Sequence, residues 1–194
     1  MNKAVFLDRD GCLNVEDDHI RNISQFRLYP QSLNSIKKLN AAGFLTIIIT
    51  NQSGVARGLI SEEFVVEVHK VLLRWVAEHG ARIDWIEHCP HHPDGVIEKY
   101  TIECDCRKPK PGMLWRAASA LDIDFSKSFV VGDKISDIEL GPATGAKSVL
   151  LRTGFGENEI IKLQQSTIEY PNYIASGIGE AVEWILRTSS SSKP

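Results

Sequence analysis

Two aspartates separated by one residue close a hydrophobic run near the start of the chain. Asp8 and Asp10 lie in the stretch FLDRDG and are followed at once by Gly11. Residues two apart in an extended backbone point the same way, so both carboxylates can face one site beyond a strand. Like charges held this close repel, and oxygen ligands of this kind suit Mg²⁺. The alternative interpretation is a solvated turn, because Asp and Gly are common turn residues.

Three further stretches place polar groups at the ends of hydrophobic runs or at the starts of helical patterns: IIITNQSG, CRKPKPG and VVGDKISDIELG. They supply Thr50 with the turn residues Asn51, Gln52 and Ser53, the cations Arg107 and Lys108, and the aspartates Asp133 and Asp137. A turn with exposed backbone N–H groups can hold an anion. Each group alone also has an ordinary structural interpretation, but four such polar groups in this order are much less likely to occur by chance.

Three of the four cysteines cluster with histidines in a segment between two predicted elements. CPHHPDG and CDC provide Cys89, His91, Cys104 and Cys106, a Cys₃His set that suits tetrahedral Zn²⁺ with no open position. We therefore predict a structural zinc that stiffens a loop too polar to fold by burial alone. His92 can replace His91 in this pattern, and free core cysteines are the simpler alternative. Cys12 lies outside the cluster and is predicted to be a packed thiol.

Buried strands must position these groups. Short apolar runs without alternation are typical of strands covered on both faces, as in a parallel sheet. The predicted strands are 3–7, 44–49, 83–89, 129–131 and 148–151. Helical spacing predicts helices at 32–42, from a Ser61 cap through His79, and at 111–121, 135–144 and 179–187.

The alternation of strands and helices predicts an α/β fold with a doubly wound, Rossmann-like parallel sheet, in which ligands bind beyond the carboxyl ends of the strands. We expect one domain over 1–188, a zinc loop over about 89–106, and a disordered tail over 189–194. No full cap domain fits between Asp10 and Thr50 or between Thr50 and Lys108. The zinc loop and the loop Gly11–Pro30 are the candidate lids.

The chain has 194 residues, 43% of them hydrophobic and 24% charged, which is enough apolar material for a sizeable core. Its net charge of −3 gives no sign of a broad basic face for nucleic acid. It shows no signal-peptide pattern and no apolar run near the roughly 20 residues that span a bilayer. We expect a cytoplasmic monomer that binds neither nucleic acid nor membrane.

The pattern DxDG, hydrophobic-Thr-Asn, Lys-Pro and GDxxxD resembles the haloacid dehalogenase (HAD) superfamily of phosphatases. FLDRDGCLN and TNQSGVARG are similar to the bacterial D-glycero-D-manno-heptose 1,7-bisphosphate 7-phosphatases and the related histidinol-phosphate phosphatases. The resemblance covers roughly residues 3–152. It favours His91 over His92 as the fourth zinc ligand, because the heptose enzymes carry a zinc loop of this kind.

The resemblance also implies catalytic roles. Asp8 is expected to be the nucleophile that forms an aspartyl-phosphate, and Asp10 the general acid and base. Thr50 and Lys108 are expected to hold the phosphoryl oxygens. The expected Mg²⁺ ligands are Asp8, Asp133 and the main-chain carbonyl of Asp10, with Asp137 orienting the site.

The implied substrate is a phosphorylated sugar, the heptose bisphosphate of lipopolysaccharide core biosynthesis. The expected substrate-binding residues are Arg9, Glu16, Asp17, Asp18, His19, Asn51, Gln52, Ser53, Arg107 and Lys134, with Arg57 as a further candidate cation near the mouth of the site. Histidinol phosphate is the alternative substrate, and the cations favour the sugar because it carries a second phosphate. A non-catalytic zinc-loop binding module is the alternative of another class.

Overall fold

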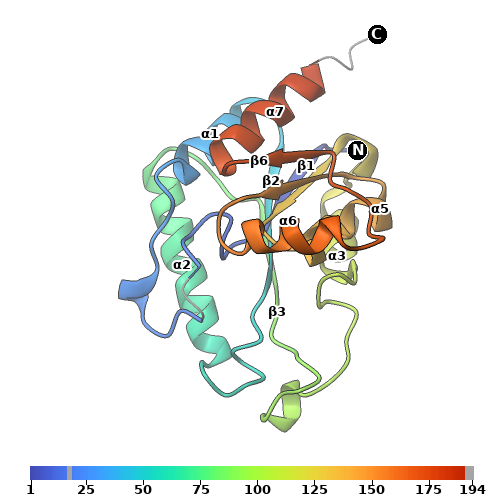
Figure 1. Cartoon of the computed structure of the whole chain (residues 1–194). Helices are drawn as coiled ribbons and strands as arrows, with labels where there is room; N and C mark the ends of the chain where they lie inside the picture. Colours follow the sequence, from blue (N-terminus) through green and yellow to red (C-terminus); the bar gives the residue numbers. More distant parts are fainter. Residues whose placement is uncertain (17–18, 191–194) are drawn as a thin grey trace.

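The computed structural model describes residues 1–16 and 19–190, and six parallel strands form one sheet in the order β3-β2-β1-β4-β5-β6 (Figure 1). The strands are β1 (Ala4–Leu7), β2 (Leu45–Asn51), β3 (Trp85–Cys89), β4 (Phe129–Gly132), β5 (Lys147–Leu151) and β6 (Tyr173–Ala175). The chain leaves β1 on one side to form β2 and β3 and returns on its other side to form β4. This reversal creates a crevice at the carboxyl ends of β1 and β4.

Helices cover both faces of the sheet. The α-helices are α1 (Ser32–Ala41), α2 (Glu62–Glu78), α3 (Gly112–Leu121), α4 (Ile135–Ile138), α5 (Leu140–Thr144), α6 (Gly156–Gln164) and α7 (Ile178–Ser190), and the 3₁₀ turns are η1 (Ile23–Gln25), η2 (Glu98–Tyr100) and η3 (Phe125–Lys127). α1, α2 and α7 pack on one face, and α3 to α6 pack on the other (Figure 1).

The strands sort their side chains by position, as the pleat requires. Val5 and Leu7 of β1 belong to the core beneath α1, α2 and α7, whereas Ala4 and Phe6 face α3. All four are fully buried, and burying a large apolar side chain contributes roughly 1.5–3 kcal/mol. The two cores therefore hold β1 rigidly, and β1 delivers Asp8 to the crevice.

The predicted fold class is confirmed, with each predicted strand within two residues of its observed bounds. Among the described residues, one strand and one α-helix were not predicted, the edge strand β6 and the helix α6. The helix predicted over 135–144 is wrong as a single element, because α4 ends at Ile138 and α5 starts at Leu140. Pro142 lies inside α5 and has no N–H to donate to the carbonyl of Ile138, so a continuous helix would lose that bond.

The α7 helix extends past the predicted end and includes Ser189 and Ser190, which the sequence assigned to a tail. The rest of that predicted tail, 191–194, lies outside the described residues. In the part of the chain that is described, only η1 and α1 separate β1 from β2, and only α2 separates β2 from β3. No helix within 1–16 or 19–190 has the length and apolar character needed to cross a membrane.

Candidate active site and metal-binding residues

Three strands deliver polar side chains to one cleft of about 310 Å³. Asp8 follows β1 directly, Thr50 is the penultimate residue of β2, and Asp133 follows β4. Asp8 and Thr50 line the cleft, and Asp133 lies fully buried beside it. The carboxyl edge of the sheet therefore holds the groups that the sequence placed at strand ends.

Most of the predicted site residues meet at this cleft. Those that line it are Asp8, Asp10, Glu16, His19, Thr50, Asn51, Gln52, Ser53, Arg107, Lys108 and Lys134. Asp133 and Asp137 lie buried behind the lining. Asp17 and Asp18 fall outside the described residues. Arg9 and Arg57 do not line the cleft.

Lys108 is a buried cation placed between two carboxylates. Its Nζ lies 2.9 Å from Asp8 Oδ1 and 2.6 Å from Asp137 Oδ1, and it donates to the Ile49 carbonyl at 3.0 Å. Burial, which alone lowers the pKa of Lys108, is outweighed by the charges of Asp137 and Asp8, so its pKa is raised. Asn51 clamps the Lys108 backbone by accepting from its N–H at 3.1 Å and donating to its carbonyl at 3.2 Å. Lys108 therefore brings a positive charge to the cleft, between Asp8 and Asp137.

Asp8, Asp133 and Asp137 form a buried acidic cluster whose ligand atoms lie within 4.8 Å of one another. Asp133 Oδ2 accepts from the Phe155 N–H at 2.8 Å, whereas its buried Oδ1 has no hydrogen-bond partner. Burial, and then the charges of Asp8 and Asp137, raise the pKa of Asp133 to about 8. A hard divalent cation satisfies the free oxygen and removes the repulsion, so these residues fit Mg²⁺.

Two glycines leave room for this cluster. A Cβ on Gly11 or on Gly154 would lie 2.2 Å from Asp133 Oδ2, and both glycines have positive φ, +80° and +58°. The glycine in FLDRDG therefore does more than turn the chain. It lets the loop after β1 approach the buried carboxylate.

Asp10 is held by donors on both of its oxygens. Asn14 Nδ2 donates to Oδ1 at 2.9 Å, Gln52 Nε2 donates to Oδ2 at 2.7 Å, and the Arg9 guanidinium binds both oxygens. Burial, which alone raises the pKa of Asp10, is outweighed by the Arg9 charge and these hydrogen bonds, so the pKa lies below its ordinary value. Arg9, which the sequence predicts to bind substrate, does not line the cleft, and its role toward substrate stays a prediction. Side chains alternate in direction along an extended chain, so that of Arg9 points away from the cleft that Asp8 and Asp10 face. The Arg9 side chain is 2% exposed.

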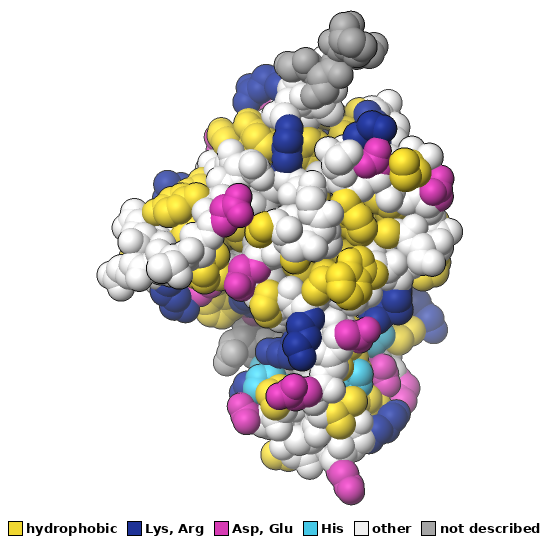
Figure 2. All heavy atoms as spheres, turned by 90° about the vertical axis from the view of Figure 1, so that its right-hand side faces the viewer, with side chains coloured by type: hydrophobic (Ala, Val, Ile, Leu, Met, Phe, Trp, Pro, Cys, Tyr) yellow, Lys and Arg dark blue, Asp and Glu magenta, His cyan; other side chains and the backbone are white. Residues whose placement is uncertain are grey.

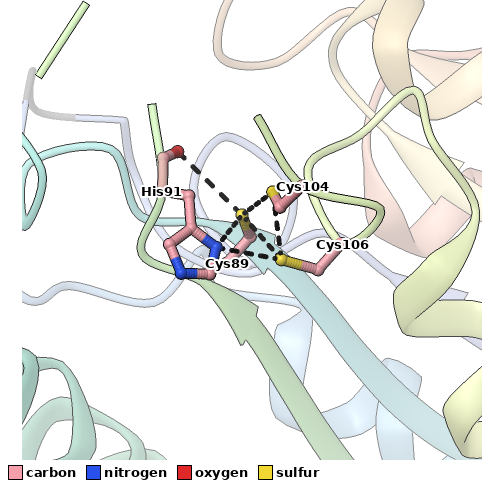
Figure 3. Close-up of side chains that lie close together, drawn as sticks. All are labelled: Cys89, His91, Cys104 and Cys106. Atoms are coloured by element: carbon pink, nitrogen blue, oxygen red, sulfur yellow. Dashed lines mark hydrogen bonds between the residues drawn. The ribbon is translucent and has the colours of Figure 1, made fainter. Parts of the chain in front are cut away.

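The cysteine cluster converges on one point (Figure 3). The sulfur of Cys106 lies 3.1 Å from that of Cys89 and 3.3 Å from that of Cys104, and His91 Nδ1 lies 3.3 Å from Cys106 Sγ. The hydrogen bond with Cys89 holds the pKa of the Cys106 thiol below its ordinary value, although burial opposes this. Three sulfurs and one imidazole nitrogen around one point fit a closed tetrahedral zinc site.

His92 does not join the cluster, so the geometry agrees with His91 as the fourth member. His92 Nδ1 accepts from the Asp94 N–H at 3.0 Å, and His92 Nε2 lies 3.3 Å from Arg57 Nη2. The segment that follows β3 protrudes at the bottom of Figure 1, and Figure 2 shows charged side chains of both signs and histidines gathered there. Arg107 lines the cleft and donates from Nη1 to the His91 carbonyl at 3.3 Å, which ties this cation to the cysteine cluster.

An ion pair joins two residues that line the cleft, Lys134 and Glu16. Lys134 Nζ lies 3.3 Å from Glu16 Oε2 and 4.5 Å from the centre of the Phe155 ring. Asp137 Oδ2 accepts from the Lys134 backbone N–H at 3.1 Å and so fixes the start of α4. The acidic loop after β1 and the loop after β4 therefore meet over the site.

Sequence reasoning missed four residues of this region. Ile20 and Ser136 line the cleft, Asn14 donates to Asp10, and His69 of α2 contacts Arg9. Asn14 and Ser136 lie inside the motifs FLDRDGCLN and GDKISD, so the motifs could have indicated them. His69 carries no such signal, because it is one residue on the buried face of an amphipathic helix.

Comparisons with known proteins show which family the chain resembles. A family model described as "HAD-hyrolase-like" matches residues 105–181. The chain is 41% identical over 181 residues to the D-glycero-β-D-manno-heptose-1,7-bisphosphate 7-phosphatase of Pasteurella multocida (strain Pm70), covering 93% of this chain and 95% of that protein. It is 39% identical to the enzyme of the same name from Escherichia coli (strain K12), over 78% of this chain and 80% of that protein.

A solved structure shares the fold along nearly the whole chain. The D,D-heptose 1,7-bisphosphate phosphatase from B. bronchiseptica, complexed with magnesium and phosphate, aligns with a TM-score of 0.84 at 31% identity, covering 96% of this chain and 99% of that one. With a full-length relative at 41% identity, the chain belongs to the D-glycero-β-D-manno-heptose-1,7-bisphosphate 7-phosphatase family of HAD-like hydrolases.

Proposed function

We propose that this protein is a Mg²⁺-dependent phosphatase that removes the 7-phosphate of D-glycero-β-D-manno-heptose 1,7-bisphosphate. The observation that carries the proposal is the convergence of Asp8, Asp10, Thr50 and Lys108 on one cleft, beside a buried Asp133 oxygen that lacks a partner. The names of the relatives support the choice of substrate and of anomer.

In the proposed reaction Asp8 attacks the phosphorus, the bond from phosphorus to O7 breaks, and an aspartyl-phosphate forms on Asp8. Asp10 gives its proton to O7 as the alkoxide leaves, and the negative charge of the bound substrate favours that protonated form. Asp10 then takes a proton from the water that cleaves the aspartyl-phosphate, which releases inorganic phosphate. Lys108 and the Thr50 hydroxyl hold the phosphoryl oxygens during both steps.

Asp8, Asp133 and the Asp10 carbonyl are the proposed Mg²⁺ ligands, with Asp137 orienting Lys108 beside them. When bound, Mg²⁺ supplies the positive charge that reduces repulsion between Asp8 and the phosphate dianion. Cys89, His91, Cys104 and Cys106 are the proposed ligands of a structural zinc. A cytoplasmic location and a monomeric state also stay predictions, and light scattering coupled to gel filtration tests the second.

The substrate proposal is tested by comparing kcat/KM for the β and α anomers of the heptose bisphosphate with kcat/KM for histidinol phosphate. We expect the β anomer to be preferred and histidinol phosphate to be the poorest of the three. A preference for histidinol phosphate would overturn the substrate and leave the phosphatase chemistry standing. A protein that releases no phosphate from any of them, with Mg²⁺ present, would be a non-catalytic zinc-loop module.

Arg107 is proposed to bind the phosphate that is not cleaved. Arg107→Ala is expected to lower kcat/KM for the heptose bisphosphate by about 10- to 100-fold, because a charge-assisted pair is lost. With 4-nitrophenyl phosphate, which has no second phosphate, kcat/KM should stay within about two-fold. Lys110→Ala is the matched control, since its side chain is 57% exposed and outside the cleft. Equal losses on both substrates would assign Arg107 to the cleaved phosphate instead.

A further inference from the structure

A buried arginine lies between the two aspartates proposed to do the chemistry. The side chain of Arg9 is 2% exposed, and its guanidinium forms a fork on Asp10. Nη2 donates to Oδ2 at 2.7 Å and to Oδ1 at 3.0 Å, and Nε donates to Oδ1 at 3.2 Å. Planar guanidinium groups fix a carboxylate in rotation as well as in position. The Asp10 side chain itself is 18% exposed and lines the cleft.

The other end of the guanidinium is held by the helix layer. Arg9 Nη1 lies 3.2 Å from Nε2 of His69, a residue of α2 that is 6% exposed. An arginine can only donate, so His69 accepts through Nε2 and is neutral. Burial, and then the charges of Arg9 and His88, lower the pKa of His69 to about 3, which agrees with a neutral ring. The Arg9 Cζ also lies 5.9 Å from the centre of the Phe26 ring, which stacks on Trp75 of α2.

We propose that Arg9, held by His69, is a positioning residue that fixes the Asp10 carboxyl group in the orientation needed to protonate the leaving oxygen. The inference rests on the proposed function, because it needs Asp10 as the general acid. Arg9 does not line the cleft, so direct substrate binding does not account for its placement. Asn14 and Gln52 restrain one Asp10 oxygen each, whereas the Arg9 fork restrains both together. A lysine offers no such fork, so the exchange is not conservative here.

The first test compares two leaving groups in Arg9→Lys. A sugar alkoxide needs a proton to leave, whereas 4-nitrophenolate leaves without one. Because kcat/KM includes only the steps up to release of the leaving group, it reports the role of Asp10 as general acid and not its later role as general base. We expect kcat/KM for the heptose bisphosphate to fall by about 10- to 100-fold, because small misplacements of a catalytic group cost that much. With 4-nitrophenyl phosphate it should stay within about two-fold. Equal losses on both substrates would overturn the inference.

The second test is a double-mutant cycle with Asp10→Asn. If Arg9 acts through the Asp10 carboxyl group, Arg9→Lys should cost less than about two-fold in kcat/KM when Asp10 is already asparagine. A loss as large as in the wild-type background would mean that Arg9 acts on the fold or on binding. Arg82→Lys is the matched control, because Arg82 also pairs with an aspartate, Asp84, but lies outside the cleft with a 58% exposed side chain.

If Arg9→Lys does not fold, His69 answers the same question. His69→Leu removes the acceptor for Arg9, and His69→Gln supplies another one. We expect His69→Leu to reduce kcat/KM for the sugar substrate selectively, and His69→Gln to retain more of it. Equal activity of the two variants would remove His69 from the proposal. Failure of the proposed function is distinguishable, since the wild-type protein would then release no phosphate from either substrate.

Discussion

Asp8→Asn is expected to lower kcat/KM for the heptose bisphosphate by at least about 10⁴-fold, the scale seen when a covalent nucleophile is removed. The amide has almost the same shape, so the Arg9 N–H at 2.8 Å and Lys108 Nζ at 2.9 Å keep an oxygen neighbour. What is lost is the carboxylate that accepts the phosphoryl group. Phosphate release by wild-type and variant protein in saturating Mg²⁺ measures the effect. The loss should be as large with 4-nitrophenyl phosphate, because both substrates need the nucleophile.

The thermal stability of Asp8→Asn distinguishes loss of the nucleophile from loss of the fold. Burial first, and then the charges of Asp8 and Asp137, raise the pKa of Asp133 to about 8. A raised carboxyl pKa means that ionisation destabilises the metal-free fold, so stability falls as pH rises from about 4 toward 8. Asp8→Asn removes one of those charges. In metal-free buffer near pH 8, its Tm should therefore equal or exceed that of the wild type.

An active Asp8→Asn variant would contradict the covalent mechanism. Retention of more than about 1% of the wild-type kcat/KM, with intact mass confirming the asparagine, would mean that water attacks phosphorus directly. A variant whose Tm falls well below the wild-type value would place Asp8 in the fold instead.

The buried half of the fold could be predicted because it follows from local patterns. Unbroken apolar runs gave the strands, and the polar residue after each run gave the edge of the sheet where Asp8, Thr50 and Asp133 meet. The strand β6 was not predicted because it is three residues long and two of its residues are only partly buried. The helix α6 was not predicted because Gly154 lies just before it and Gly156 is its first residue, and two glycines this close are typical of a loop. Gly156 is required there, since a Cβ would lie 1.7 Å from the Leu151 carbonyl oxygen.

Arg9 shows what a sequence motif alone does not predict. The same alternation that pairs Asp8 with Asp10 sends Arg9 toward α2, the side that Val5 and Leu7 face. The direction of the Arg9 side chain could therefore be predicted from the sequence, but its contact with His69 could not. Nothing in the spacing of α2 separates His69 from an ordinary buried helix residue. Contacts between elements distant in the chain decide such roles, and 60 residues separate Arg9 from His69.

Loss of zinc is the second large effect that we expect. Wild-type protein should contain about one tightly held zinc per chain, and Cys106→Ser should contain almost none. Loss of zinc releases both ends of the loop that carries Lys99, whose side chain is 74% exposed. Trypsin should therefore cleave at Lys99 much faster in the variant. Cys12→Ala is the control, because Cys12 is buried outside the cluster and its loss should leave the zinc content unchanged.

The same variant should lose about 10- to 100-fold in kcat/KM for the heptose bisphosphate, as Arg107→Ala does, because Arg107 then has no fixed position. Arg107 adjoins Cys106 and bonds to the His91 carbonyl, both within the cluster. Lys108 has independent anchors, since Asn51 binds its backbone on both sides and the Ile49 carbonyl accepts from its Nζ. Activity toward 4-nitrophenyl phosphate, which depends on Lys108 and not on a second phosphate, should fall far less.

The expected difference between the two substrates is the result that can contradict the zinc prediction. If Cys106→Ser lost zinc yet kept full activity on the bisphosphate, the metal would stabilise a loop that has no part in binding substrate. If kcat/KM fell equally for both substrates, the loop would position Lys108 as well. The hydrogen bonds from Asn51 would then not be enough to hold Lys108 in place. Selective loss on the bisphosphate is the expected result, because zinc restrains the segment up to Cys106 and the sheet edge restrains the residue two positions later.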